Sequence, residues 1–77
     1  MIELFMKNSC GYCMKVISVL EEHNIPYERV DIEDAKNEEL LILLGGKRQV
    51  PFIYDKNTGV QMYESNDIIE YLKTLNL

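Results

Sequence analysis

The chain has 77 residues, of which 47% are hydrophobic and 27% are charged, and it contains only two prolines and four glycines. This composition excludes a disordered or fibrous protein and predicts one small soluble domain over residues 1–77, while the net charge of −5 disfavours nucleic acid as a partner because phosphate binding needs a basic surface. No apolar run approaches the roughly 20 residues that cross a bilayer and the first residues lack a secretory signal, so we expect no membrane partner and a cytoplasmic location.

The first part of the chain predicts a strand, a helix and a second strand. The nearly continuous apolar run from Ile2 to Lys7 is typical of a short buried strand. A helical pattern follows the turn-forming pair Asn8-Ser9 and ends at His23-Asn24, ahead of a proline. Polar and apolar residues alternate from Tyr27 to Ile32, which predicts the second strand. The apolar positions of the helix recur at three- and four-residue spacing: Met14, Val16, Ile17 and Leu20.

A second helix is predicted in the middle of the chain. Either Asp34 or Asn37 can cap its start, and Gly45-Gly46 ends it. Its apolar surface comes from four leucines, Leu40, Leu41, Leu43 and Leu44.

The last third predicts two strands and a final helix. Phe52 to Tyr54 and Val60 to Tyr63 are short strands joined by a loop rich in turn-forming residues. A last amphipathic helix follows Ser65, which can cap it, and has apolar positions at Ile68, Ile69, Tyr71, Leu72 and Leu75. A strand-helix-strand opening implies parallel pairing through a right-handed crossover, whereas the short loop implies an antiparallel neighbour. We therefore expect an α/β domain of order β-α-β-α-β-β-α, with a four-stranded mixed sheet flanked by three helices.

The only two cysteines, Cys10 and Cys13, stand between the first strand and the first helix. A Cys-x-x-Cys pair beside a strand-helix-strand pattern is typical of thioredoxin-like redox proteins. If the helix starts near Gly11, its free N–H groups favour a thiolate at Cys10, whereas Cys13, one turn on, keeps a higher pKa. We expect Cys10 to attack a disulfide, and Cys13 or an external thiol to release the mixed disulfide that forms.

Two other interpretations of the cysteine pair are a metal site and inert buried thiols. Zinc usually needs four ligands, and the only other soft donor is His23 at the far end of the helix. We therefore expect no bound metal.

Half of the eight basic residues flank the cysteines or the Val50-Pro51 step. They either lie by chance on solvated turns or form a local positive rim, which would favour a thiolate and attract a small anionic thiol. These four residues are Lys7, Lys15, Lys47 and Arg48.

Three segments of the chain resemble the glutaredoxins in their order and spacing, and this resemblance covers essentially the whole chain. They are Lys7-x-x-Cys10-Gly11-Tyr12-Cys13, Gln49-Val50-Pro51 and Tyr63-Glu64-Ser65-Asn66-Asp67. Glu64-Ser65 also resembles the acidic-Ser pair of glutathione-transferase N-terminal domains. The resemblance implies a thioredoxin-like (glutaredoxin) fold and a glutathione-dependent thiol-disulfide oxidoreductase that reduces protein disulfides and glutathione mixed disulfides.

The resemblance also implies a role for each residue around the cysteines. Cys10 matches the nucleophile of the glutaredoxins and Cys13 matches their resolving cysteine. Lys7 matches the cation that pairs with a carboxylate of glutathione, and Tyr12 matches the aromatic residue beside the bound tripeptide.

The other two segments match the rest of the glutathione site. Val50 matches the residue whose backbone bonds the cysteinyl part of glutathione, and Pro51 matches the cis-proline of the family. Glu64, Ser65 and Asn66 match the residues that hold the γ-glutamyl part at a helix N-terminus, a natural anion site. From the sequence alone, Ser65 fits an ordinary helix cap equally well, and the two roles can coexist.

Two departures from the glutaredoxin pattern leave alternatives open. Gly11 stands where many relatives carry proline, which resembles relatives that hold an iron-sulfur cluster between two subunits with glutathione as a ligand. Leu43 and Leu44 stand near where relatives often place a polar residue for the glycyl carboxylate, which leaves Lys7 and Arg48 as candidate cations.

We expect a monomer whose partners are glutathione and disulfide-containing or glutathionylated proteins. The alternatives are a redoxin reduced by thioredoxin reductase and an iron-sulfur cluster carrier.

Overall fold

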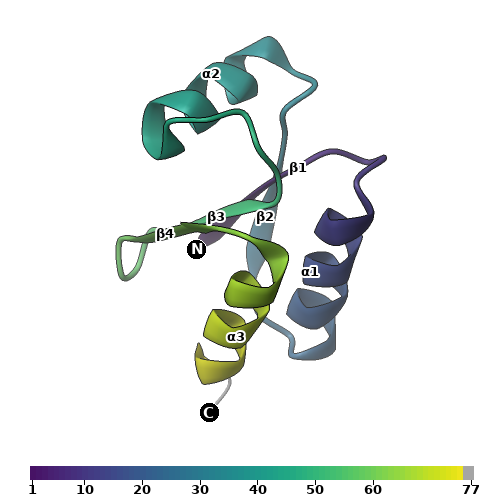
Figure 1. Cartoon of the computed structure of the whole chain (residues 1–77). Helices are drawn as coiled ribbons and strands as arrows, with labels where there is room; N and C mark the ends of the chain where they lie inside the picture. The colour runs from purple at the N-terminus through teal and green to yellow at the C-terminus, as the bar shows by residue number, and fades with distance from the viewer. Residues whose placement is uncertain (76–77) are drawn as a thin grey trace.

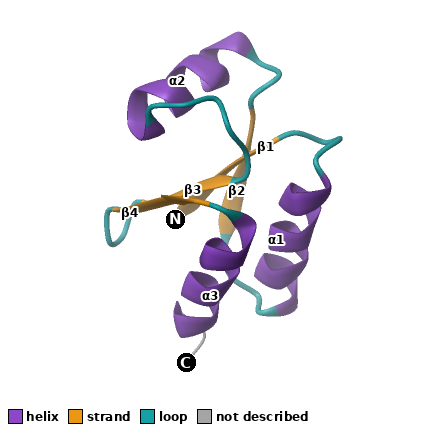
Figure 2. Cartoon of the chain, in the orientation of Figure 1, coloured by secondary structure: helices purple, strands orange, loops and turns teal. Residues whose placement is uncertain are grey.

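The computed structural model describes residues 1–75 and confirms the predicted order of strands and helices (Figure 2). The four strands form one sheet in the order β2-β1-β3-β4. β1 pairs with β2 in parallel and with β3 in antiparallel orientation, and β3 and β4 are antiparallel. The elements are β1 (Ile2–Met6), α1 (Gly11–Glu22), β2 (Tyr27–Asp31), α2 (Ala35–Gly45), β3 (Phe52–Asp55), β4 (Val60–Tyr63) and α3 (Ser65–Leu75).

Three strand ends differ by one residue from the prediction. β1 and β2 each end one residue earlier, although the N–H of Ile32 still donates to the carbonyl of Met6 at 3.0 Å. β3 is one residue longer, because Asp55 is paired with both Ile2 on β1 and Val60 on β4.

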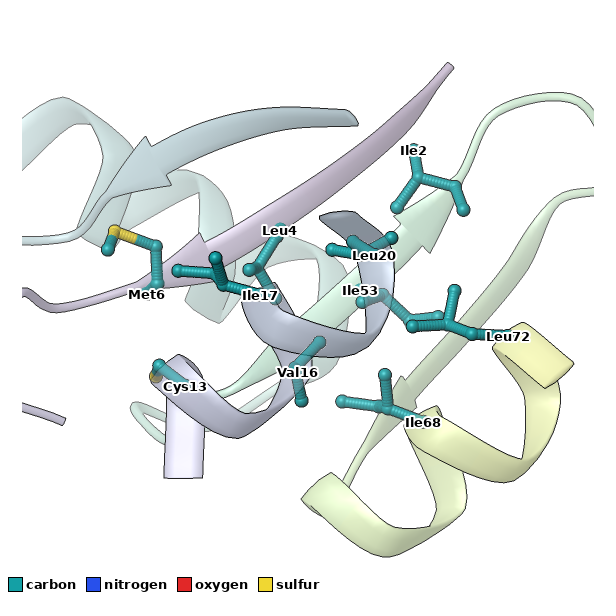
Figure 3. Close-up of a cluster of buried hydrophobic side chains, with 10 residues drawn as sticks. All are labelled: Ile2, Leu4, Met6, Cys13, Val16, Ile17, Leu20, Ile53, Ile68 and Leu72. Carbon is teal, nitrogen blue, oxygen red and sulfur yellow. The ribbon is translucent and has the colours of Figure 1, made fainter. Parts of the chain in front are cut away.

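The sheet separates two hydrophobic layers because successive residues of β1 point to opposite faces. Ile2, Leu4 and Met6 face α1 and α3, which lie side by side on one face of the sheet (Figure 1). Phe5 points the other way, toward α2 and Phe52. The larger core, on the α1 and α3 side, is shown in Figure 3 and consists of Ile2, Leu4, Met6, Cys13, Val16, Ile17, Leu20, Ile53, Ile68 and Leu72.

Helix α2 buries less of its apolar surface than the sequence suggested. Asp34 caps its N-terminus, whereas Asn37 lies inside the helix and donates to the carbonyl of Asp31 at 2.9 Å. Leu41 is fully buried, but the side chain of Leu43 is 82% exposed. The apolar residues of α2 follow one another around the helix instead of forming a stripe, so one face of it cannot cover them all. Within residues 1–75, none of the helices is long and apolar enough to cross a membrane.

Tyr63, at the end of β4, connects the segment after α2 to the sheet. Its hydroxyl donates to the carbonyl of Lys47 at 2.7 Å, and its ring packs against Phe52 with ring centroids 4.5 Å apart. The same hydroxyl occupies the space next to Gly45, where a Cβ atom would overlap it. Glycine is therefore required at the end of α2 by a close approach of another side chain.

Asp55 is a buried carboxylate at the opposite end of β3 from the cis-proline. It is only 2% exposed, and it accepts hydrogen bonds from the hydroxyl of Tyr71 at 2.6 Å and from the N–H of Asn57 at 3.0 Å. Burial opposes ionisation, but hydrogen bonds from Tyr71, Asn57 and Thr58 favour the carboxylate, and the net result is a pKa of Asp55 below its ordinary value. This carboxylate ties the β3-β4 turn to α3.

The substitution Gly45→Ala is expected to lower the free energy of unfolding by about 1–3 kcal/mol, because the new methyl group displaces Tyr63. Gly11→Ala is the matched control, since a Cβ atom at Gly11 meets nothing within 4 Å. Urea denaturation of the two variants measures the difference. Equal stabilities would contradict the close contact at Gly45.

Tyr71→Phe is expected to cost about 1–3 kcal/mol near neutral pH, because a buried carboxylate loses a hydrogen bond. The folded-state pKa of Asp55 lies below its ordinary value of 3.8, so this stabilisation is complete above about pH 4 and is lost as the pH falls through the lowered pKa. Denaturation at pH 7 and pH 3 should therefore show a smaller loss at the acidic pH. The control is Tyr54→Phe, whose hydroxyl has no hydrogen bond in the described chain; a pH-independent loss in Tyr71→Phe would refute the mechanism.

Candidate active site

The backbone before α1 places the sulfur of Cys10 at the amide end of the helix. The N–H of Cys10 donates to the carbonyl of Lys7 at 3.1 Å, which closes a turn after β1. Cys10 has extended backbone angles and is the N-cap residue of α1. Its sulfur accepts the N–H of Cys13 at 3.1 Å, and its carbonyl accepts the N–H of Met14 at the same distance. A cysteine thus does here what a Ser or Asp oxygen does at most helix starts.

The two thiols, both free, differ in their exposure, and the pKa of the buried thiol is raised. Cys10 is half-buried, whereas Cys13 is fully buried and packs in the larger core (Figure 3). Burial, followed by hydrogen bonding to the Cys10 side chain, raises the pKa of Cys13 to about 12. The Cys13 thiol therefore stays protonated at neutral pH, and a thiol is a far weaker nucleophile than a thiolate.

A groove of about 540 Å³ begins beside α1 and runs to the start of α3. Six of the nine predicted site residues line it, and they come from three separate segments of the chain. The peptide bond between Val50 and Pro51 is cis, as the resemblance implied. Cys10, Cys13 and Lys7 do not line the groove itself. The six residues are Tyr12, Val50, Pro51, Glu64, Ser65 and Asn66.

The N-terminus of α3 opens on this groove. Glu64 has a positive φ of 71°, and its carbonyl accepts the N–H of Ile68 at 3.0 Å. Glu64 therefore occupies the cap position, and the prediction that Ser65 caps the helix is wrong: Ser65 is its first residue. The side chains of Ser65 and Asn66 make no hydrogen bond within residues 1–75. The first-turn N–H groups, which have no partner inside a helix, are left for an anion in the groove.

Gln49 also lines the groove, although its sequence position alone indicated no role. Its side-chain amide donates to a carboxylate oxygen of Glu64 at 3.2 Å and so connects the cis-proline segment to the start of α3. Asp67 is a further lining residue that was not singled out. Both residues lie inside the motifs that carried the resemblance, so their position next to predicted site residues was the available signal.

The fold separates the four cations of the predicted positive rim into two pairs, one before β3 and one beside the cysteines. Arg48 forms an ion pair with Glu38 on α2, so the suggestion that it serves as a free cation for the glycyl carboxylate is weakened. The ammonium group of Lys47 lies 4.9 Å from the centroid of the Tyr63 ring, in the geometry of a cation-π contact. These two cations stabilise the segment between α2 and β3.

The other two cations of the rim are next to the cysteines. Neither Lys7 nor Lys15 has an acidic partner in the described part of the chain. The charge of Lys7 acts to lower the pKa of Cys13, although burial outweighs it. The ammonium group of Lys15 lies 5.7 Å from the centroid of the Tyr12 ring. Positive charge is therefore available at the Cys10 end of the groove.

A metal site is not formed by the residues that the structure describes. Within residues 1–75, no three His, Cys, Asp or Glu side chains are close enough to hold one metal ion. His23, the other soft donor considered above, is the C-cap residue of α1, at the opposite end of that helix from Cys10.

Comparison with known proteins gives a consistent family assignment. The family described as the N-terminal domain of glutathione S-transferase matches residues 4–76. Glutaredoxin 1 of Rickettsia felis is 34% identical over 62 residues, which cover 77% of this chain and 61% of the relative. Prostaglandin E synthase 2 of Danio rerio is 34% identical over 73 residues, which cover 95% of this chain and 19% of the relative. The chain thus spans about three fifths of one relative and about one fifth of the other.

The solved structures confirm the predicted fold. The thioredoxin-like protein BC3987 has a TM-score of 0.83 and 25% sequence identity, and the match covers 97% of this chain and 99% of that one. The thioredoxin-like arrangement expected from the sequence is therefore found along nearly all of the chain.

Alkylation with iodoacetamide at pH 7–9 is expected to modify Cys10 and spare Cys13, because the Cys13 thiol is buried and its pKa is about 12. Mass spectrometry of the digested protein measures each site. In Cys10→Ser, labelling of Cys13 should stay slow until the protein unfolds, because burial, the largest cause of its raised pKa, remains. Labelling of both cysteines at equal rates in the folded protein would contradict the arrangement.

Proposed function

The chain belongs to the family of glutathione S-transferase N-terminal domains, and from that membership we propose that it is a glutathione-dependent thiol-disulfide oxidoreductase that reduces protein disulfides and glutathione mixed disulfides. The single observation that carries this proposal is the sulfur of Cys10 at the amide end of α1, 3.1 Å from the N–H of Cys13. A helix N-terminus stabilises negative charge, and the attacking species in disulfide exchange is a thiolate. The similarity to a glutaredoxin supports the same activity.

With a glutathionylated protein, one cysteine is sufficient. The Cys10 thiolate attacks the glutathione sulfur, the protein sulfur leaves as a thiolate, and glutathione stays on Cys10 as a mixed disulfide. A second glutathione thiolate then attacks the glutathione sulfur of this adduct. The products are glutathione disulfide and the Cys10 thiolate, so one free glutathione is consumed for each glutathionylated protein that is reduced.

With a protein disulfide, both cysteines take part. Cys10 attacks one substrate sulfur and the other leaves, after which Cys13 attacks Cys10 and releases the reduced substrate. The charge on Cys10 contributes to the raised pKa of Cys13, and that contribution disappears once Cys10 is bound in a mixed disulfide. Cys13 is therefore easier to deprotonate in the mixed disulfide, the state in which it attacks the Cys10 sulfur. The resulting Cys10-Cys13 disulfide is then reduced by two molecules of glutathione.

The groove fits a tripeptide with charged ends. Its volume of about 540 Å³ lies within the range of roughly 300–1,000 Å³ that is typical of small-molecule sites. In the proposed complex, the backbone of Val50 bonds the cysteinyl part of glutathione. The γ-glutamyl carboxylate lies at the N–H groups of Ser65 and Asn66, its ammonium group faces Glu64, and Lys7 is available for the other carboxylate.

We expect Cys10→Ser to abolish reduction of both substrate classes, because no other thiolate is available at the groove. Cys13→Ser should keep most of the deglutathionylation activity, which needs one protein thiol, and should lose reduction of protein disulfides. A coupled assay with glutathione and glutathione reductase measures both reactions. Retention of activity by Cys10→Ser would refute the proposal, and turnover only with thioredoxin reductase as electron donor would favour the alternative redoxin.

A further inference from the structure

Charges of opposite sign lie near the two ends of the groove. Glu64 and Asp67 line its α3 end, whereas Lys15 contacts the ring of Tyr12, which lines the other end. We propose that Lys15, together with the ring of Tyr12, selects protein substrates that carry an acidic residue next to the disulfide. This inference rests on the proposed function and names the class of polypeptide that the same site prefers.

Lys15 is suited to this role because its charge is not neutralised by an acidic side chain and its position is defined by Tyr12. It is exposed and has no acidic partner in the described part of the chain. It stands three residues after Tyr12 on α1, so the two side chains are neighbours on the helix surface, and the ammonium group lies 5.7 Å from the ring centroid. Tyr12 is 65% exposed and lines the groove. A polypeptide bound over Tyr12 therefore passes within reach of Lys15.

Several other cations are already engaged elsewhere. Arg29 pairs with Glu21, and Lys56 pairs with Glu3 at 3.1 Å. Arg48, in the segment between α2 and β3, pairs with Glu38. Lys15 thus differs from these basic residues in combining an available charge with a place beside the nucleophile.

The acidic end of the groove gives the preference a direction. At the α3 end, a substrate carboxylate that lies beside the side chains of Glu64 or Asp67, and not at the N–H groups of the first turn, meets like charge, whereas one placed over α1 meets Lys15. The chain as a whole carries a net charge of −5, so its distant field does not attract acidic proteins in general. The local charge therefore discriminates between orientations and between flanking residues, and it does not raise the rate for every acidic protein.

The test compares two short peptides that carry the same disulfide, flanked by Asp in one and by Lys in the other. The readout is the ratio of their kcat/KM values with glutathione as reductant, so that any general loss of activity cancels. For the unaltered chain we expect a ratio of about 1.4 to 5 in favour of the Asp peptide, the range given by one exposed ion pair. The ratio should fall toward one in 0.5 M salt, which screens exposed charges.

Lys15→Glu should reverse the preference, because repulsion replaces attraction. The matched control is Lys73→Glu, which makes the same charge change in the last turn of α3, away from the groove, and should keep the ratio of the unaltered chain. Thermal unfolding of both variants shows whether each is folded. If Lys15→Glu fails to fold, Lys15→Gln replaces it and should bring the ratio to about one.

The outcomes separate this inference from the proposed function. Reduction of the mixed disulfide of glutathione and 2-mercaptoethanol by the unaltered chain establishes the proposed function independently of any peptide. If that reaction occurs but the two peptides react equally at low salt, or if Lys15→Glu and Lys73→Glu give the same ratio, the role of Lys15 is overturned. If the unaltered chain reduces none of the three substrates, the proposed function fails and the inference fails with it.

Discussion

The hydrogen bond from the N–H of Cys13 to the sulfur of Cys10 is the interaction on which the account depends. It fixes the Cys10 sulfur at the end of α1, where unpaired N–H groups and the helix dipole favour negative charge. The same helix takes Cys13 one turn further into the core, where burial keeps that thiol protonated. One local geometry therefore gives two cysteines with different chemistry, as a two-step disulfide exchange requires.

The rest of the fold holds the groove next to this sulfur. β1 delivers Cys10 from the centre of the sheet, between β2 and β3. Two hydrogen bonds between distant segments hold the part of the groove away from α1. The hydroxyl of Tyr63 donates to the carbonyl of Lys47, and the side-chain amide of Gln49 donates to the carboxylate of Glu64. Both contacts join the C-terminal end of β4 to the segment before β3. They therefore hold the backbone of the cis-proline segment at a defined distance from the free N–H groups of α3. A small ligand would meet a largely preformed site.

Local patterns in the sequence were sufficient to predict the fold and the place of the cysteines. The predictions that depend only on neighbouring residues are confirmed by the structure. Helix α1 starts directly after Cys10 and buries its periodic apolar residues, and helix α2 ends at Gly45-Gly46. One prediction was wrong because of local backbone geometry: Glu64 replaces Ser65 as the cap of α3 through a positive φ that no sequence pattern signalled. The pairing of Arg48 with Glu38 and the exposure of Leu43 could not be predicted, because they depend on how α2 lies against the sheet.

A crystal structure of Cys13→Ser with glutathione on Cys10 tests the central claim most directly, since the variant cannot release the adduct through its second thiol. The account predicts a disulfide between Cys10 and glutathione, with the peptide in the groove, its cysteinyl backbone bonded to Val50 and its γ-glutamyl carboxylate within hydrogen-bond distance of the N–H groups of Ser65 and Asn66. Failure of Cys10 to form the adduct, or an adduct whose peptide lies outside the groove, would contradict it.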